Sequence, residues 1–432
     1  MSKSPDNTLE LLQRYESRNI TFVDPAGDWP IVWQKAKGVH VWDVEGKKYV
    51  DLTAAFGVAA AGHCNRKVVV AGQQQMDTLM HAMGDVHPHP LKAQLAAELS
   101  RLTFGRWNRQ SGKTIFCNSG FEAVEAALKT ALLATGKKGI IAFHGAYHGL
   151  GYGALNATHR GMFRKPFATQ LGRFGKWATF PVSNNEFRRA KAEILMGLEK
   201  GKTGAILLEP IQGRGGLRVP HPSFLPWLRS ACDRHGALLI LDEIYTGFGR
   251  TGKWFGCEHW KVVPDLVCLG KALTGGFPLS ACVGRAELMD EAWPESDGEA
   301  LHTSTFLGHP VGCAMALANL REIRKMKLTA AAARMEKVLA RELNTFSAPD
   351  GYRLAVCGKG LMIGLEITRT DGSPATVEGG RIMKNLLHRG YIILPEGDHG
   401  NVIGIIPPLI ITEKQLLRAC KVLRSEIAQL SS

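Results

Sequence analysis

The sequence predicts an α/β fold built on a mostly parallel sheet with helices on both faces. Short apolar runs typical of buried strands alternate with stretches of helical composition along the middle of the chain. The expected strands are 113–117, 139–143, 204–208, 237–241, 266–269 and 280–283. Segment 121–135 is rich in alanine and segment 224–235 repeats apolar residues at helical spacing, so both are expected to be helices.

A second, smaller α+β domain is expected from the two ends of the chain. Apolar runs at 39–44 and 48–52 flank Glu45-Gly46, which is a hairpin signal. Helices are expected at 313–327 and 330–344, strands at 361–367 and 391–394, and a last helix capped by Thr412. The expected division places the N-terminal part of the small domain at 1–54, the large domain at 55–315 and the C-terminal part of the small domain at 316–432.

The composition is that of an ordinary globular protein, and its charge favours small anionic ligands. Of 432 residues, 45% are hydrophobic and 21% are charged, with a formal net charge of +14. The basic residues are dispersed, so nucleic acid is not an expected partner. We see no signal peptide and no run of about 18 apolar residues that predicts a membrane span, so a cytoplasmic protein without membrane contact is expected.

The cysteines and histidines do not predict a metal site. The nine cysteines are scattered and form no C-x-x-C pair, which favours reduced structural thiols. His144 and His148 have metal-like spacing, but the sequence offers no third ligand nearby. No metal is therefore expected.

Two nucleotide-binding patterns overlap at 247–253, and both lack the context that they need. The residues from Gly247 to Gly252 fit G-x-G-x-x-G, but they do not directly follow the preceding strand, and the residues after them are a poor helix start. A P-loop requires Ser or Thr after its lysine, and here Trp254 follows Lys253. Neither nucleotide site is favoured.

Lys271 and Asp242 are the candidate reactive residues. Lys271 lies between the apolar run 266–269 and small residues at 272–276, and burial there would favour its neutral, nucleophilic amine. The alternative is a snorkelling surface lysine. Asp242 ends the run 236–241, at the edge where open α/β sheets bind ligands. It is either a capping or paired carboxylate, or the partner of a cation such as a pyridinium nitrogen.

Two loops add an anion site and an aromatic face. Ser119-Gly120 joins an expected strand to an expected helix, and a helix N-terminus binds anions, although Ser119 would also be an ordinary helix cap. Tyr147 lies in the glycine-framed loop 144–149, where a packed tyrosine is the alternative. Together with Lys271 and Asp242, these signals describe one ligand, pyridoxal 5′-phosphate.

At this point the chain resembles the class III aminotransferases, in the fold-type I group of pyridoxal-phosphate enzymes, over nearly its whole length. The matching segments are 42–46, 62–63, 118–123, 143–149, 209–213, 241–252, 270–276, 303–306 and 407–409. The blocks around Asp242 and Lys271 are the most specific. The resemblance implies a large domain with a mostly parallel, seven-stranded sheet flanked by helices, a small α+β domain, and a homodimer with shared active sites, or a tetramer.

The resemblance also implies roles for individual residues. Lys271 would form the internal aldimine and then move a proton, and Asp242 would keep the pyridine nitrogen protonated. The other implied contacts are Ser119, Gly120 and Phe121 at the phosphate, Tyr147 and Ile244 on the ring faces, Glu209 beneath the site near Asp242 or His148, Tyr245 near the ring hydroxyl, and Thr305 from the neighbouring subunit. An amine or amino acid would donate the amino group, and a 2-keto acid would accept it.

Two departures from the family pattern concern the substrate. Many relatives carry an arginine before the Pro-Pro-Leu segment, where this chain has Gly404, and a glutamate where it has Arg214. We expect Arg214 to bind the carboxylate of the keto acid, with a solvent-facing arginine as the alternative. Phe56 and Trp33 are candidate walls of the substrate pocket, although either could be a core residue.

Other reactions are found on the same framework. Amino-acid racemases and epimerases, aminomutases and decarboxylases share these motifs, so they remain the alternative to amino transfer. A non-catalytic cofactor-binding regulator would be expected to carry a DNA-binding domain or to lack the lysine, and the sequence shows neither.

Overall fold

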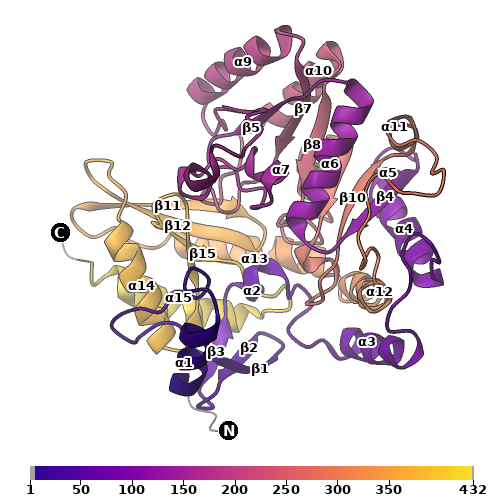
Figure 1. Ribbon diagram of the computed structural model, residues 1–432. Coiled ribbons are helices and arrows are strands. Elements are labelled where there is room, and N and C mark those ends of the chain that lie inside the picture. Colours follow the sequence, from indigo (N-terminus) through magenta and orange to yellow (C-terminus); the bar gives the residue numbers. More distant parts are fainter. Residues whose placement is uncertain (1–4, 431–432) are drawn as a thin grey trace.

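The computed structural model describes residues 5–430, and its centre is a seven-stranded sheet in the order β4-β10-β9-β8-β7-β5-β6 (Figure 1). The strands are β4 Gly112–Cys117, β5 Gly139–Phe143, β6 Gly175–Ala178, β7 Thr203–Leu208, β8 Leu238–Asp242, β9 Leu266–Leu269 and β10 Ser280–Arg285. Only β10 is antiparallel to its neighbours, β4 and β9. The expected α/β fold with a mostly parallel sheet is confirmed.

The central strands are apolar on both faces because helices cover both. Side chains alternate along a strand, and the neighbours Ile140 and Ile141 on β5 belong to two different hydrophobic clusters. Helix α6 packs in the cluster that contains Ile140, and α9 and α10 pack in the cluster that contains Ile141. Near-continuous apolar strands are the pattern expected of such a sheet.

The helices differ widely in length. They are α1 Pro5–Tyr15, α2 Ala54–Gly57, α3 Arg66–Thr78, α4 Pro90–Leu102, α5 Phe104–Trp107, α6 Gly120–Thr135, α7 Tyr152–Leu155, α8 Gly161–Arg164, α9 Asn184–Glu199, α10 Phe224–His235, α11 Ala286–Ala292, α12 Pro310–Lys325, α13 Leu328–Leu343, α14 Thr376–His388 and α15 Glu413–Ile427. Within the described residues, no helix is long and apolar enough to cross a membrane.

Two four-stranded sheets lie beside the central one. One has the order β1-β2-β3-β13, with β1 Trp33–Lys37, β2 His40–Asp43, β3 Lys48–Asp51 and β13 Tyr391–Ile392. The other has the order β11-β12-β15-β14, with β11 Tyr352–Lys359, β12 Met362–Arg369, β15 Val402–Ile405 and β14 Leu394–Glu396. Because β13 pairs with β3, segments from both ends of the chain share a sheet. The division at 54 and 315 stays a prediction.

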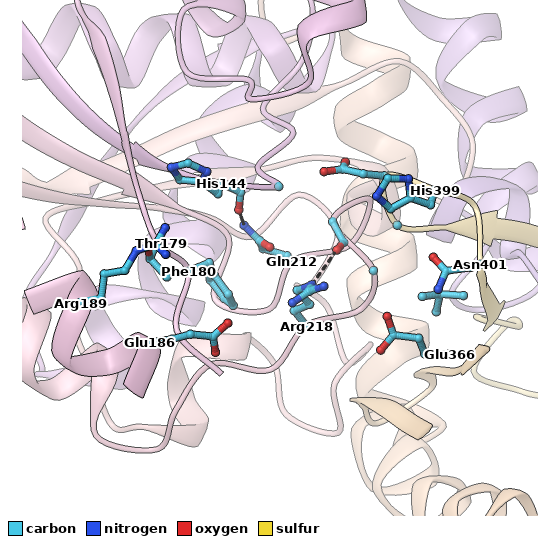
Figure 2. A pocket seen from close by; sticks show the side chains of 16 residues that line it. His144, Thr179, Phe180, Glu186, Arg189, Gln212, Arg218, Glu366, His399 and Asn401 are labelled. Carbon is cyan, nitrogen blue, oxygen red and sulfur yellow. Dashed lines mark hydrogen bonds between the residues drawn. The ribbon is translucent and has the colours of Figure 1, made fainter. Parts of the chain in front are cut away.

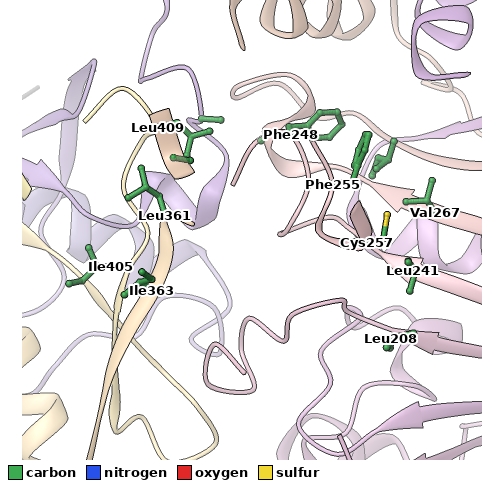
Figure 3. Close-up of a cluster of buried hydrophobic side chains, with 14 of the residues drawn as sticks. Leu208, Leu241, Phe248, Phe255, Cys257, Val267, Leu361, Ile363, Ile405 and Leu409 are labelled. Atoms are coloured by element: carbon green, nitrogen blue, oxygen red, sulfur yellow. The ribbon is translucent and has the colours of Figure 1, made fainter. Parts of the chain in front are cut away.

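One hydrophobic cluster joins the central sheet to the sheet of β11, β12, β15 and β14 (Figure 3). Leu208 and Leu241 reach it from the central sheet, and Ile363 and Ile405 reach it from the smaller one. Phe248, from the glycine-rich segment after β8, is fully buried in the same cluster. This segment forms turns followed by the 3-10 helix Gly256–His259, so it lacks the helix start of a dinucleotide-binding turn.

Several expected elements need correction. Segment 391–394 is not one strand but parts of β13 and β14, which belong to different sheets. The helix expected at 313–327 begins earlier, because Pro310 can occupy a first helical turn. Thr412 caps α15 as expected, and its hydroxyl accepts a hydrogen bond from Gln415 N. The elements without an expectation from the sequence include β1, β6, β11, β15, α3, α4 and α14.

Candidate active site

A cavity of about 430 Å³ opens at the C-terminal ends of β5, β7 and β8. Ten residues singled out from the sequence line it, together with Gly149 and Leu150: they are Gly120, Phe121, Tyr147, His148, Glu209, Arg214, Asp242, Ile244, Tyr245 and Lys271. Ligands of open α/β sheets bind at this edge. Segments distant in the sequence thus meet in one place.

Lys271 follows β9 and begins the 3-10 helix Lys271–Leu273 with a positive φ of 38°. Its Nζ lies 4.2 Å from the centroid of the Tyr245 ring. Burial lowers the pKa of Lys271, although the charges of Asp242 and Glu209 act in the opposite direction. The lowered pKa favours the neutral amine, which is a nucleophile towards carbonyl carbon.

Asp242 is the last residue of β8 and is 4% exposed. Its Oδ1 accepts a hydrogen bond from Ile244 N at 3.1 Å, and its Oδ2 accepts one from His148 Nδ1 at 2.8 Å. A carboxylate buried to this extent needs a cationic partner or several donors. The protonated nitrogen of a pyridine ring would supply the cation on the cavity side.

Glu209 lies at the end of β7 and joins two loops of the cavity. One carboxylate oxygen accepts a hydrogen bond from Tyr147 N at 3.1 Å, and the other accepts one from Gly213 N at 2.9 Å. Burial raises its pKa, while the charge of His148 opposes that rise. Glu209 therefore positions the loop of Tyr147 and the loop that carries Arg214.

The N-terminus of α6 lies at the cavity, where Gly120 and Phe121 are lining residues. Glu122 Oε2 accepts hydrogen bonds from Asn118 N at 2.6 Å and Ser119 N at 3.0 Å, whereas Ser119 Oγ is buried without a hydrogen-bond partner in residues 5–430. A Cβ on Gly120 would lie 3.0 Å from Ile244 Cδ1. The missing side chain keeps the space open next to backbone donors, which suits a phosphate.

Aromatic and aliphatic side chains, among them Tyr147, Ile244 and Tyr245, form other parts of the cavity wall. The Tyr147 ring contacts Phe163 edge-on at 5.9 Å, and Ile244 lies against Gly120. The Tyr245 ring is held between two glycines, because a Cβ on either Gly57 or Gly213 would come within 2.5 Å of it. Tyr147, Ile244 and Lys271 all line the same cavity.

Five of the expected site residues do not line this cavity of their own chain, and one of them, Ser119, directly precedes the lining residue Gly120. Thr305 is exposed in the loop before α12, and Trp33 on β1 packs edge-on against His63 at 5.9 Å. Phe56, 56% exposed, lies in the left-handed turn Ala54–Gly57. Gly404 is buried within β15.

One residue near the cavity was missed in the sequence. Glu396 ends β14 and is 4% exposed, and its Oε2 lies 3.8 Å from Arg214 Nε. Nothing in the motif pattern marks it, because it comes close to Arg214 only through the pairing of β14 with β15. Gly149 and Leu150, which also line the cavity, directly follow the matched histidine motif.

A second, polar cavity of about 290 Å³ is lined by Gln212 and Arg218 (Figure 2) and also by Gly215 and Gly216, which follow Arg214 in the sequence. Gln212 Nε2 donates a hydrogen bond to His144 O at 2.8 Å, and Arg218 Nε donates one to Gly215 O at 3.2 Å. These bonds fix the backbone on both sides of Arg214. Within the described part of the chain, no group of three or more His, Cys, Asp or Glu residues could hold a metal ion.

The donor set fits pyridoxal 5′-phosphate. An unpartnered hydroxyl and a helix N-terminus suit the phosphate, Asp242 suits the ring nitrogen, and Lys271 suits the aldehyde. The fit is specific because all these groups line or adjoin one cavity.

Comparison with known proteins agrees with this fit. Residues 22–427 match the family model described as aminotransferase class-III. The chain is 38% identical over 391 residues to the acetylornithine aminotransferase of Methanosarcina mazei, covering 90% of each chain. It is 33% identical to the 5-aminovalerate aminotransferase of Pseudomonas aeruginosa, covering 98% of each.

Solved structures give the same result. An ornithine aminotransferase from Toxoplasma gondii, 27% identical, superposes with a TM-score of 0.84 over 98% of this chain and 94% of that one. A pyridoxal-phosphate-bound amine transaminase from an uncultivated Pseudomonas species, 28% identical, gives 0.86 over 96% and 98%. The chain therefore belongs to the class III aminotransferases, the pyridoxal-phosphate-dependent transaminases of fold type I.

Proposed function

We propose that the cavity around Lys271 is the site of amino transfer, from an amine or amino-acid donor to a 2-keto acid whose carboxylate binds Arg214. The observation that carries this proposal is the placement of Lys271 in one cavity with Asp242 and Arg214. Lys271 supplies a nucleophile, Asp242 a counter-charge for a ring nitrogen, and Arg214 a cation for a carboxylate.

Pyridoxal phosphate would supply an aldehyde carbon and a ring that withdraws electrons from the substrate carbon. Asp242 would hold the ring nitrogen, and the pair with His148 keeps that carboxylate oriented. The residues proposed to hold the rest of the cofactor are Ser119, Gly120 and Phe121 at the phosphate, Tyr147 and Ile244 on the ring faces, and Tyr245 near the hydroxyl. Glu209 contributes by fixing the Tyr147 loop.

Lys271 has two tasks in this proposal. Its neutral Nζ would hold the cofactor through the aldehyde carbon. Its free amine would take a proton from the substrate carbon that carries the amino group and would later return a proton. The Tyr245 ring, 4.2 Å from Nζ, stabilises the ammonium form between these steps.

The substrate end of the cavity is cationic. Arg214 is only partly buried and faces the cavity, with its Cζ 5.9 Å from the Tyr147 ring centroid. A guanidinium pairs with a carboxylate in a bidentate manner, which orients the keto acid as well as binding it. Gly404 leaves β15 without the arginine that many relatives carry there. Phe56 and Trp33 are proposed to act at the mouth of the pocket.

We propose a homodimer that completes the site. Met80, Met83, Val86, Leu301 and Phe306 are exposed large hydrophobic residues in two neighbouring segments, joined by a hydrogen bond from Thr303 to Asp85. Apolar patches of this kind mark association surfaces. Thr305 lies in the same loop as Phe306, so a second copy covering this surface would receive Thr305 near its own phosphate site.

The proposal is tested with a panel of amino donors against pyruvate and 2-oxoglutarate. The purified protein is expected to consume keto acid only when a donor is present, and Lys271→Ala is expected to lose this activity. Lys253→Ala, which removes a surface lysine, serves as the control and should behave like the wild type. Racemisation of an amino acid without keto-acid consumption would overturn the proposed transfer.

A further inference from the structure

Arg214 and Glu396 are close but do not satisfy each other. The distance of 3.8 Å between Arg214 Nε and Glu396 Oε2 is too long for a hydrogen bond. Both atoms are buried, and neither has a hydrogen-bond partner among the residues that the structure describes. Glu396 is 4% exposed, whereas the Arg214 side chain is 36% exposed. Arg214 therefore lies between a buried acid and the cavity.

Gly404 makes room for this acid. Leu394 on β14 pairs with Gly404 on β15, and a Cβ on Gly404 would lie 3.2 Å from Glu396 Cγ. A larger side chain at position 404 would displace the Glu396 side chain. The glycine at position 404 thus leaves the space that the Glu396 side chain occupies.

The backbone holds the two residues at a fixed separation. Arg160 Nη2 donates hydrogen bonds to Arg214 O and to Gly397 O, both at 2.6 Å, and Gly397 N donates to Arg214 O at 3.1 Å. Gln212 and Arg218, both labelled in Figure 2, donate hydrogen bonds to His144 O and Gly215 O in the same region. The backbone of Arg214 is thus tied to Gly397, next to Glu396, while its side chain lines the cavity.

We propose that Glu396 and the carboxylate of the bound keto acid compete for Arg214, and that Glu396 Oε takes a proton from solvent when the keto acid binds. This inference rests on the proposed role of Arg214. A buried carboxylate that loses the guanidinium 3.8 Å from it is costly to keep ionised, so it becomes protonated. A substrate without a carboxylate leaves the Arg214–Glu396 pair intact and takes up no proton.

The surroundings of Glu396 agree with a titration near neutral pH. The charged or titratable groups that act on it are Arg214, Lys271, Arg160, Glu209 and Tyr245. Burial raises the pKa of Glu396 to about 7, although Arg214, Lys271 and Arg160 oppose the rise. Below this pKa Glu396 is neutral and Arg214 is free for the ligand; above it Glu396 is charged and competes. Carboxylate ligands should bind more weakly as the pH rises.

The experiment measures binding of glutarate, a dicarboxylate that cannot be aminated, to the holoenzyme by calorimetry in two buffers with different heats of ionisation. For a carboxyl with a pKa of about 7, the wild type should take up roughly three-quarters of a proton at pH 7.5, and affinity should fall about tenfold between pH 6 and pH 8. Glu396→Gln should take up no proton and bind with one affinity across this range. The control Glu366→Gln, on β12, should match the wild type.

Two variants separate this inference from the proposed function. Loss of glutarate binding in Arg214→Ala supports the proposed carboxylate site, and unchanged binding there overturns it. If Arg214→Ala loses binding while Glu396→Gln takes up the same fraction of a proton as the wild type, the competition is wrong and the carboxylate site stands. A second readout is the KM for pyruvate, which should rise with pH in the wild type and stay flat in Glu396→Gln, relative to the KM for an aldehyde acceptor.

Discussion

Lys271 and Asp242 share one cavity, yet burial has different consequences for the two. The pKa of Lys271 is lowered, which favours an uncharged amine. Asp242 keeps two donors, Ile244 N and His148 Nδ1, and each satisfies one of its oxygens. The cavity thus contains a nucleophile, Lys271, and a carboxylate, Asp242, and two protein hydrogen-bond donors orient that carboxylate.

Asp242→Asn tests the charge of this acid. The amide can still accept a hydrogen bond from Ile244 N, but it offers no negative charge to a ring nitrogen. Removing one partner of a buried charged pair costs about 3 kcal/mol, so kcat/KM should fall by at least about 100-fold. Steady-state kinetics check this, with the exposed Asp371→Asn as control. A loss of less than threefold would contradict the assigned role.

At the scale of elements, the N-terminus of α6 has an unusual cap. Ser119 Oγ has no hydrogen-bond partner among residues 5–430, whereas the equivalent Ser183 Oγ of α9 accepts a hydrogen bond from Glu186 N at 3.3 Å. An N-cap hydroxyl normally stabilises its helix by about 1 kcal/mol. The cap of α6 therefore has a free hydroxyl that a phosphate can use.

Ser119→Ala and Ser183→Ala form a matched pair. Ser119→Ala should leave the melting temperature of the cofactor-free protein almost unchanged while weakening cofactor binding several-fold, since a hydrogen bond to a charged group contributes about 1.5–3 kcal/mol. Ser183→Ala should lower the stability by about 1 kcal/mol and leave cofactor affinity intact. Thermal melting and cofactor titration of the apo proteins distinguish them, and equal effects on cofactor affinity would count against the phosphate site.

The left-handed turn Ala54–Gly57 lies next to Tyr245, which lines the cavity. Ala54, Ala55 and Phe56 have φ values of 48°, 47° and 61°, and Gly57 touches the Tyr245 ring. Such a conformation is strained for residues other than glycine. Asp51 holds the turn, accepting hydrogen bonds from Thr53 N and Ala55 N at 2.7 and 3.0 Å.

Gly57→Ala should displace Tyr245 and disturb Lys271, because the new Cβ would lie 2.5 Å from Tyr245 Cε2. We expect kcat/KM to fall by about tenfold or more, a change of at least ~1.4 kcal/mol. Gly136→Ala is the control, since Gly136 also has a positive φ but has open space around it. It should lower stability by about 1 kcal/mol with unchanged kinetics. Full activity in Gly57→Ala would refute the link to Tyr245.

Most strands of the central sheet could be predicted because each is marked by apolar residues within its own segment of the sequence. A short apolar run such as 139–143 predicts a strand that is buried on both faces of the sheet. Thr412 likewise predicts the start of α15 through an ordinary capping pattern. The motif residues of the cavity could be found for the same reason. Glu396 could not, because its nearness to Arg214 depends on the pairing of β14 with β15. The split of 391–394 between two sheets has the same long-range cause.

The whole molecule is proposed to act as a dimer of two identical chains. The exposed surface formed by 80–86 and 301–306 carries large hydrophobic side chains and is the proposed contact. Sedimentation should give a particle of twice 47.1 kDa. A replacement of Met83 by Asp should shift the protein towards the monomer and lower its activity. A fully active monomer would contradict shared sites.

Mixed dimers test the sharing directly. Lys271→Ala and Thr305→Asp subunits should each have little activity alone, because one lacks the nucleophile and the other places a negative charge at the partner's phosphate site. A hybrid of the two contains one intact site, so mixing should restore activity towards half that of the wild type per dimer. No recovery on mixing would show that Thr305 does not act across the interface.

The central claim is that Lys271 is the lysine that binds the cofactor. Borohydride added to the protein in the presence of pyridoxal 5′-phosphate fixes the cofactor covalently to the lysine that carries it, and peptide mass spectrometry locates the label. We predict one labelled peptide, containing Lys271, and no label at that position in Lys271→Ala. A label on another lysine, or none in the wild type, would contradict it.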